Sequence, residues 1–259
     1  MRITVITVCR NAVDVIDKTV RSVLSQTYRE LEYIVVDGDS TDGTLDRLRG
    51  YGDLIAHILS EPDTGVYNAM NKALRLVTGD IIVFLNAGDC FASMRVAASV
   101  MKAFSNDPDV KLVYGDLLAV FPNGAKLSIK QPGQVTRWKL WLRGLCHQTV
   151  FARRELFESL GCFDEGLPIC ADWDWTLRAV IISGVKAVHL PIRICDYSMG
   201  GLSANQEALR HDKRELHRRY YSRMERCFFS LLEAVYKVGA RVHIQNYSPP
   251  WIIRRVFKR

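Results

Sequence analysis

The feature that most constrains the fold is a series of short apolar runs, rich in β-branched residues, that alternate with stretches of helical periodicity. The runs are Ile3–Val8, Tyr33–Val36, Leu54–Leu59, Ile81–Leu85, Leu112–Tyr114 and Val185–Leu190. Between the first four lie Asp14–Gln26, Thr41–Leu48 and Val66–Val77, in which apolar residues recur at helical spacing. Strands that alternate with helices predict a parallel sheet with crossover helices. We therefore expect an α/β fold with a Rossmann-like, mostly parallel sheet flanked by helices.

Beyond about residue 115 the alternation loosens. Asp172–Ile182 is predicted to be a further helix, and Glu207–Tyr236 a long, basic helical stretch that ends near Gly239. The chain carries 35 Lys and Arg against 28 Asp and Glu, a net charge of +7. Six of these cations and no acid fall in 235–259, so the body is close to neutral and gives no reason to expect a nucleic-acid surface. A cationic tail with apolar residues favours an anionic membrane face.

Within this tail, 251–259 alternates apolar and basic residues in a way that suits an interfacial amphipathic helix. A solvated basic terminus or an oligomer contact is the alternative interpretation. The seven cysteines form no CxxC pair, which predicts reduced thiols in a reducing cytoplasm rather than a zinc site or a disulfide framework. Ile3–Val8 is too short for a signal-peptide core, and no run approaches the ~18 residues of a membrane-spanning helix.

Polar residues follow each of the first four predicted strands. These segments are 7–11, 37–43, 60–65 and 86–89, and all contain acids or amides. Ligands of open α/β sheets bind at the carboxyl ends of the strands, so the four segments predict one nucleotide site, although Asp, Asn and Gly also favour turns and caps. Neither GxGxxG nor GxxxxGK[ST] is present. A divalent cation that bridges phosphate oxygens to a carboxylate is the simplest substitute.

Several motifs make a resemblance specific. Ile34-Val35-Val36-Asp37-Gly38-Asp39-Ser40-Thr41-Asp42-Gly43-Thr44 resembles the sugar-nucleotide motif of glycosyltransferase family 2. Five further motifs resemble a bacterial polysaccharide branch of that family, and colanic-acid-type fucosyltransferases in particular. They lie at 60–72, 84–89, 147–151, 171–174 and 197–203. The resemblance covers roughly residues 1–205 and implies a GT-A fold. It also implies a nucleotide-sugar half, 1–115, and an acceptor half, 116–205. The remaining residues, 206–259, are predicted from their pattern to form a helical basic extension that associates with a membrane.

The resemblance implies roles for donor-site residues. Asp37 would hold the nucleobase, and Thr7 and Arg10 would flank the nucleotide. The other implied donor contacts are Asp39, Asp63, Asn71, Asn86, Ala87 and Gly88. Met70 stands where the family more usually has an arginine. Asn86-Ala87-Gly88-Asp89 replaces the frequent Asp-x-Asp-Asp pattern, so Asp89 is the one carboxylate left to hold Mn²⁺ or Mg²⁺; capping the next helix is its alternative role.

Asp172 matches the general base of the family, the group that takes the proton of the acceptor hydroxyl as the sugar is transferred with inversion. Asp174 is its competitor, with a first-turn charge on the helix dipole as its alternative role. Acceptor-site or lid positions are His147, Gln148, Tyr197, Gly200 and Gly201. His147 could equally be structural, and the two glycines could form an ordinary turn.

Together these features predict an inverting glycosyltransferase that moves a sugar from a GDP- or UDP-linked donor to a lipid-linked saccharide acceptor. The expected setting is bacterial exopolysaccharide, capsule or O-antigen synthesis, peripheral on the cytoplasmic face of the plasma membrane. Two alternatives stay open: a weak or inactive nucleotide-sugar-binding protein, and another sugar-nucleotide enzyme such as a nucleotidyltransferase. The sequence leaves the oligomeric state open.

Overall fold

In the computed structural model, which describes residues 1–200 and 205–242, the core is a mixed sheet with the strand order β3-β2-β1-β4-β8-β6-β9-β5, and β7 pairs with β6. The strands are β1 Ile3–Cys9, β2 Leu31–Asp37, β3 His57–Ser60, β4 Ile81–Phe84, β5 Cys90–Phe91, β6 Val110–Val120, β7 Lys126–Ile129, β8 Val150–Arg153 and β9 Lys186–Ser198. The neighbours β3, β2, β1 and β4 are parallel, and β6 is parallel to β9. The predicted α/β class is confirmed.

Strand β8 reverses the direction of the sheet. It pairs antiparallel with β4 on one side and with β6 on the other. Val83 lies opposite Phe151, and Ile81 lies opposite Arg153. The residues that precede β8 therefore lie at the same edge as the carboxyl ends of β1, β2 and β4. This edge is the one that the sequence predicts to carry the nucleotide site.

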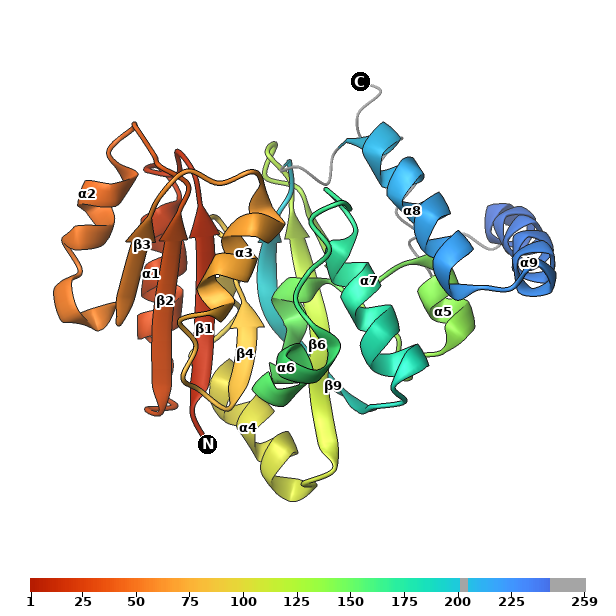
Figure 1. Ribbon diagram of the computed structural model, residues 1–259, viewed down its shortest axis with the longest axis horizontal. Coiled ribbons are helices and arrows are strands. Elements are labelled where there is room, and N and C mark those ends of the chain that lie inside the picture. The colour runs from red at the N-terminus through yellow and green to blue at the C-terminus, as the bar shows by residue number, and fades with distance from the viewer. Residues whose placement is uncertain (201–204, 243–259) are drawn as a thin grey trace. The chain divides into compact units, whose positions relative to one another are not determined.

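Helices cover both faces of the sheet. The α-helices of the described residues are α1 Ile16–Leu24, α2 Thr44–Arg49, α3 Val66–Leu74, α4 Val96–Asn106, α5 Arg137–Leu142, α6 Arg154–Leu160, α7 Ala171–Leu177, α8 Gln206–Tyr220 and α9 Arg223–Val242. Figure 1 shows α3, α6 and α7 in front of the sheet and α1 behind it. Buried side chains of α1 and α4 form one cluster with Ile3, Val5 and Val83, which point to that rear face. Apolar strands covered on both faces are the expected result.

Two predicted strands are longer in the structure: Leu112–Tyr114 is part of β6, and Val185–Leu190 is part of β9. Pro191 does not end β9, which continues to Ser198. The register between β6 and β9 shifts at Gly115, where the strands bulge. A Cβ atom at Gly115 would lie 2.6 Å from Ile194 Cγ1 and 2.9 Å from two carbonyl oxygens, so only glycine fits this close approach. The predicted strand Leu54–Leu59 begins only at His57, after a short 3₁₀ turn at Gly52–Leu54.

The predicted helical stretch Glu207–Tyr236 is helical in the structure, with one interruption. Two helices occupy it, and α9 starts after Ser222 with a capping box. The Glu225 backbone N–H donates to Ser222 Oγ (3.2 Å), and the Ser222 N–H donates to Glu225 Oε2 (2.8 Å). The pattern Ser-x-x-Glu was the signal for this helix start.

The chain divides into two compact units, Met1–Lys213 and Arg214–Arg259. The domain limits drawn at 205/206 remain a prediction. None of the described helices is long and apolar enough to cross a membrane. All seven cysteines are free thiols, and Cys9, Cys90, Cys170 and Cys195 are buried.

Candidate active site

Asp37 ends β2 at the predicted edge and organises the loop that follows. It is fully buried. Its Oδ2 accepts hydrogen bonds from the Ser40 N–H (3.0 Å) and the Ser60 hydroxyl (2.8 Å), and its Oδ1 accepts from the Ser40 hydroxyl. These bonds tie the loop after β2 to the end of β3, so the structure gives Asp37 an organising position in the predicted nucleotide site.

Close packing at Gly38 brings a second predicted donor residue to the same place. A Cβ atom at Gly38 would lie 2.2 Å from Asp63 Oδ2 and 3.4 Å from Arg10 Cβ, so a side chain there would displace Asp63. Arg10 and Asp39 are exposed at this edge, and Asp39 has a positive φ of 58°. Arg10 and Asp63 thus lie next to Gly38 in the loop after β2, and Asp39 is part of the same loop.

Two other predicted donor residues are occupied by contacts within the fold. Thr7 is fully buried in β1, where its hydroxyl donates to the Leu85 carbonyl (2.7 Å). The amide of Asn71 on α3 donates to the Phe163 carbonyl (3.0 Å) and to Glu165 (2.8 Å), and its Oδ1 accepts from the Phe163 N–H (3.0 Å). Asn71 therefore fastens the segment that leads to α7 onto α3.

Asp89 closes the turn after β4 and is nearly inaccessible, with 3% of its surface exposed. Its Oδ1 accepts from the Ser198 N–H (2.7 Å) and its Oδ2 from Gln148 Nε2 (3.0 Å). Burial raises the pKa of this carboxyl to about 6. Its hydrogen bonds join Asp89 to β9 and to the segment before β8. Helix α4 starts seven residues later, at Val96, so these contacts do not cap that helix.

We tested whether these residues suit a divalent cation. No three His, Cys, Asp or Glu side chains of the described chain are grouped as a metal site. A buried carboxylate whose ionisation is penalised by burial is nevertheless a good single ligand, since each oxygen keeps a lone pair and a cation offsets the cost of the charge. Asp89 therefore fits an ion whose other ligands are diphosphate oxygens and water.

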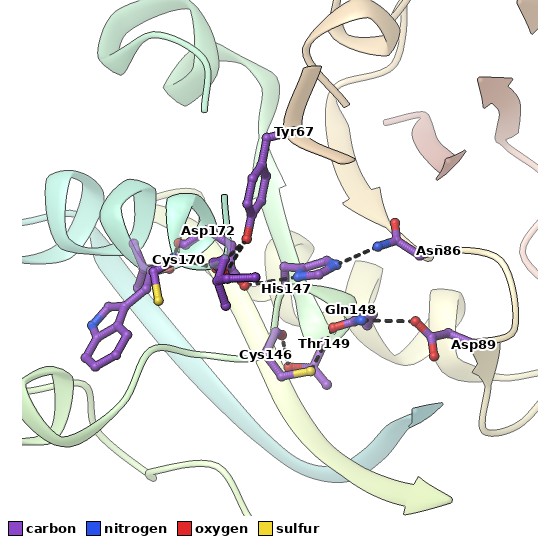
Figure 2. Close-up of polar contacts among 12 residues, drawn as sticks. Tyr67, Asn86, Asp89, Cys146, His147, Gln148, Thr149, Cys170 and Asp172 are labelled. Carbon is purple, nitrogen blue, oxygen red and sulfur yellow. Dashed lines mark hydrogen bonds and ion pairs between the residues drawn. The ribbon is translucent and has the colours of Figure 1, made fainter. Parts of the chain in front are cut away.

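Asp172 lies at the start of α7, in the first turn, within a network of side chains (Figure 2). Its Oδ2 accepts from His147 Nδ1 (3.0 Å), and its Oδ1 accepts from the Tyr67 hydroxyl (3.0 Å) and the Trp173 N–H (2.8 Å). The Asp172 side chain keeps 18% of its surface exposed. A carboxylate that is oriented by donors on two sides and open to solvent is suited to accept a proton.

The segment just before β8 joins this network to the loop after β4. His147 and Gln148 form a single 3₁₀ turn, His147–Thr149. His147 contacts Asn86 Nδ2 through Nε2 (3.2 Å), while Gln148 binds Asp89 (Figure 2). His147 thus connects the predicted base, Asp172, to Asn86. The adjacent buried residue Gln148 holds the predicted metal ligand, Asp89.

Tyr67 is a site residue to which the sequence analysis gave no role. It is buried on α3, and its hydroxyl lies 3.0 Å from Asp172 Oδ1 and 2.9 Å from the Ile169 carbonyl. Burial, and then the negative charge of Asp172, raise the pKa of Tyr67 well above its usual range, so its hydroxyl stays a donor. Its helical spacing by itself indicates only a core position, yet Tyr67 falls inside the motif at 60–72.

The other predicted residues of the described chain lie in α7, in β9 and in the turns after β4 and β9. Asp174 is 2% exposed and pairs with Arg178 Nε (2.9 Å) one turn along the helix, away from Asp172. Tyr197 lies within β9 rather than in a loop. Ala87 and Gly88 form the turn before Asp89, with Gly88 at a φ of 93°. Gly200 has a φ of 116°, and Gly201 lies outside the described residues.

The sequence matches a known protein family and several of its members. The glycosyl transferase family 2 model matches residues 4–161. An uncharacterized glycosyltransferase of Mycobacterium tuberculosis is 30% identical over 224 residues, which cover 84% of this chain and 85% of that protein. A PGL/p-HBAD biosynthesis glycosyltransferase of Mycobacterium bovis is 31% identical over 202 residues, 74% of this chain and 75% of the relative.

Solved structures share the fold at low identity. S. aureus TarS 1–349 in complex with UDP-GlcNAc superposes with a TM-score of 0.67 at 19% identity, and the match covers 82% of this chain and 65% of that one. The mannosyltransferase PcManGT from Pyrobaculum calidifontis, in complex with GDP-Man and Mn²⁺, superposes with a TM-score of 0.62 at 23% identity. This match covers 98% of this chain and 79% of that one. The family model and the mycobacterial relatives show that this chain belongs to glycosyltransferase family 2 and is a glycosyltransferase.

Proposed function

We propose that this glycosyltransferase moves a sugar from a GDP- or UDP-linked donor to a lipid-linked saccharide, with inversion, in bacterial exopolysaccharide, capsule or O-antigen assembly. The observation that carries the proposal is the position of Asp172. Its carboxylate is bonded to His147, which also contacts Asn86 in the loop after β4. A base next to the loop that would hold the donor is what single-displacement transfer requires.

The chemistry follows from this arrangement. The acceptor hydroxyl approaches Asp172 and loses its proton to the carboxylate as its oxygen attacks the anomeric carbon. The bond between that carbon and the diphosphate breaks, and the diphosphate leaves on the opposite face, which inverts the configuration. Oδ1 has two described donors and Oδ2 has one, so we assign the incoming proton to Oδ2. A metal held by Asp89 would neutralise the charge of the departing diphosphate.

Support for the donor class comes from two solved relatives. TarS 1–349 was obtained with UDP-GlcNAc and PcManGT with GDP-Man and Mn²⁺. The resemblance to colanic-acid-type fucosyltransferases favours GDP-fucose as the donor. A calorimetric panel of GDP, UDP, dTDP and CMP, each with and without Mn²⁺, identifies the base. Tight, metal-dependent binding of GDP supports a fucosyl or mannosyl donor, and UDP binding counts against it.

Asp172→Asn tests the base. This change keeps the size of the side chain but removes its capacity to take a proton at neutral pH. We expect turnover to fall by a factor of 10² to 10⁴, within the typical range for a general base, while the affinity for the nucleoside diphosphate stays within twofold. Surviving turnover would refute the base assignment. Binding without turnover in the wild type, across donors and acceptors, would instead favour the alternative of a nucleotide-sugar-binding protein.

Support for a membrane-bound acceptor comes from the second compact unit, Arg214–Arg259. It holds 11 of the 35 Lys and Arg residues and 3 of the 28 Asp and Glu residues, a net +8, so the first unit carries −1. On α9, four large apolar side chains at heptad-like spacing are 58–84% exposed: Met224, Phe228, Leu231 and Val235. An apolar stripe on a cationic unit suits the interface of an anionic bilayer. The tail 251–259, predicted to bind membranes, lies outside the described residues.

Vesicle sedimentation tests this surface and the expected peripheral, cytoplasmic-face location. The full chain should bind phosphatidylcholine vesicles with 30% phosphatidylglycerol at least tenfold more tightly than pure phosphatidylcholine. Phe228→Glu should lose most of this binding, whereas Ser230→Glu, which adds the same charge on another side of α9, should lose much less. If Phe228→Glu binds like Ser230→Glu, the stripe is not the membrane contact. If it binds normally but dissociates an oligomer, α9 instead contacts a second copy of the chain.

A further inference from the structure

The Asn86–His147 contact determines where the proton of the His147 ring sits. Asn86 Nδ2 is a donor only, and it lies 3.2 Å from His147 Nε2. Nε2 must therefore offer its lone pair. A neutral imidazole carries one proton, which then resides on Nδ1 and is donated to Asp172 Oδ2 at 3.0 Å. The three side chains form a directed chain of donors that runs from Asn86 to His147 to Asp172 (Figure 2).

This direction depends on the residue that departs from the family pattern. Asp-x-Asp-Asp is frequent in the family, but this chain has Asn86 at the first position. A carboxylate there would accept a hydrogen bond and would draw a proton onto Nε2. Asp172 would then face either the lone pair of Nδ1, which repels it, or a doubly protonated imidazolium, which pairs with it as a cation. Each outcome makes Asp172 a poorer acceptor of the substrate proton.

We propose that Asn86 holds His147 as the neutral Nδ1–H tautomer, and that His147 is thereby a positioning residue that orients Asp172 for proton transfer. This inference rests on the proposed role of Asp172 as base. His147 touches no substrate atom in the proposal and acts through the carboxylate. The burial of the pair supports it: the His147 and Asp172 side chains are only 17% and 18% exposed.

The first test reads the tautomer directly. Protein labelled with ¹⁵N-histidine gives a long-range ¹H–¹⁵N spectrum in which protonated and unprotonated ring nitrogens resonate far apart, and His147 is assigned by its absence in a His147→Asn variant. We expect a protonated Nδ1 and a bare Nε2 in the wild type, and a protonated Nε2 in Asn86→Asp. A wild-type spectrum with the proton on Nε2 would overturn the proposal without reference to any variant.

The second test separates positioning from packing. In His147→Asn the amide nitrogen replaces Nδ1 and keeps a donor toward Asp172, whereas in His147→Gln it replaces Nε2 instead. We expect kcat to fall roughly 100-fold in His147→Gln, the scale of a misplaced catalytic group, and His147→Asn to recover about tenfold of this loss. The affinity for the nucleoside diphosphate should change less than threefold in both. Equal rates, or a faster Gln variant, would refute the directed donor.

His189 provides the matched control. It makes a similar contact, Nε2 to Asp116 Oδ1 at 2.8 Å, between β9 and β6. Its Asn and Gln variants should not differ from each other in kcat. The outcome of Asp172→Asn distinguishes the two proposals. If that variant keeps turnover, the assignment of Asp172 as the base fails, and the role of His147 fails with it. If the variant is inactive while His147→Asn and His147→Gln are equal, only the role of His147 fails.

Discussion

Replacing the buried Asp89 should remove a specific pH dependence of stability. Burial places the pKa of Asp89 at about 6, against 3.8 for a free carboxyl. A tenfold change in a proton equilibrium corresponds to about 1.4 kcal/mol, so ionising Asp89 costs about 3 kcal/mol more in the folded protein than in the unfolded chain. The penalty is absent below pH 3.8, where both states hold the proton, and it is complete once the pH has passed 6.

Between pH 4 and pH 7.5 the wild type should therefore lose about 2.4 kcal/mol of stability through this group, relative to Asp89→Asn. Urea unfolding in a metal-free buffer measures the difference between the two free energies of unfolding at each pH. Asp39→Asn is the matched control, because Asp39 is exposed at the same edge of the sheet. If the difference between wild type and Asp89→Asn changes by less than about 0.5 kcal/mol over this range, the burial argument is wrong.

Three further predictions concern the site and its support. Because Asp89 is the one carboxylate of its loop, calorimetry should detect tight Mn²⁺ binding only when the cognate nucleoside diphosphate is present, and none in Asp89→Asn; tight binding of Mn²⁺ alone would contradict this assignment. Tyr67→Phe keeps the ring against Phe163 but removes a donor to Asp172, so kcat should fall about tenfold with nucleotide affinity unchanged. Its control is Tyr114→Phe, which removes a hydroxyl bonded to the Pro132 carbonyl and should leave kcat as it is. Arg178→Met takes the guanidinium away from the buried Asp174 and should lower the free energy of unfolding by about 3–5 kcal/mol, measured by urea denaturation; a loss below about 1 kcal/mol would refute the buried-pair argument.

The first half of the fold could be predicted because its signals are local. Apolar strands and amphipathic helices alternate up to β4, and each strand ends in a polar loop, so the parallel order of β1, β2 and β4 follows from the connections. The later strands depend on long-range pairing. The bulge at Gly115 lets β9 continue past Pro191, and nothing in the local sequence of β9 indicates that partner.

The candidate site shows the same limit. Its two loops after β2 and β4 could be predicted from their position at strand ends. The contacts of His147 with Asp172 and Asn86 could not be predicted, because they depend on the antiparallel pairing of β8 with β4 and β6. This strand is short, and periodicity does not distinguish it from the residues around it. Asn71 has contacts that its motif does not indicate, since its amide is bonded to the backbone of Phe163 and to Glu165. Its contact with the donor stays a prediction.

The reversed strand β8 also has a consequence for how this enzyme can diverge. The loops after β1, β2, β3 and β4 come from the first 89 residues, whereas Asp172 follows β8 in the chain. The two halves meet at this edge through contacts of α3 and through those of the neighbouring side chains His147 and Gln148. The Ser198 N–H, which donates to Asp89, adds a further contact. Mutations after β8 can therefore reshape the surface that receives the acceptor while the earlier loops keep their geometry. A single scaffold could thus acquire new acceptors during evolution without rebuilding its recognition of the activated sugar.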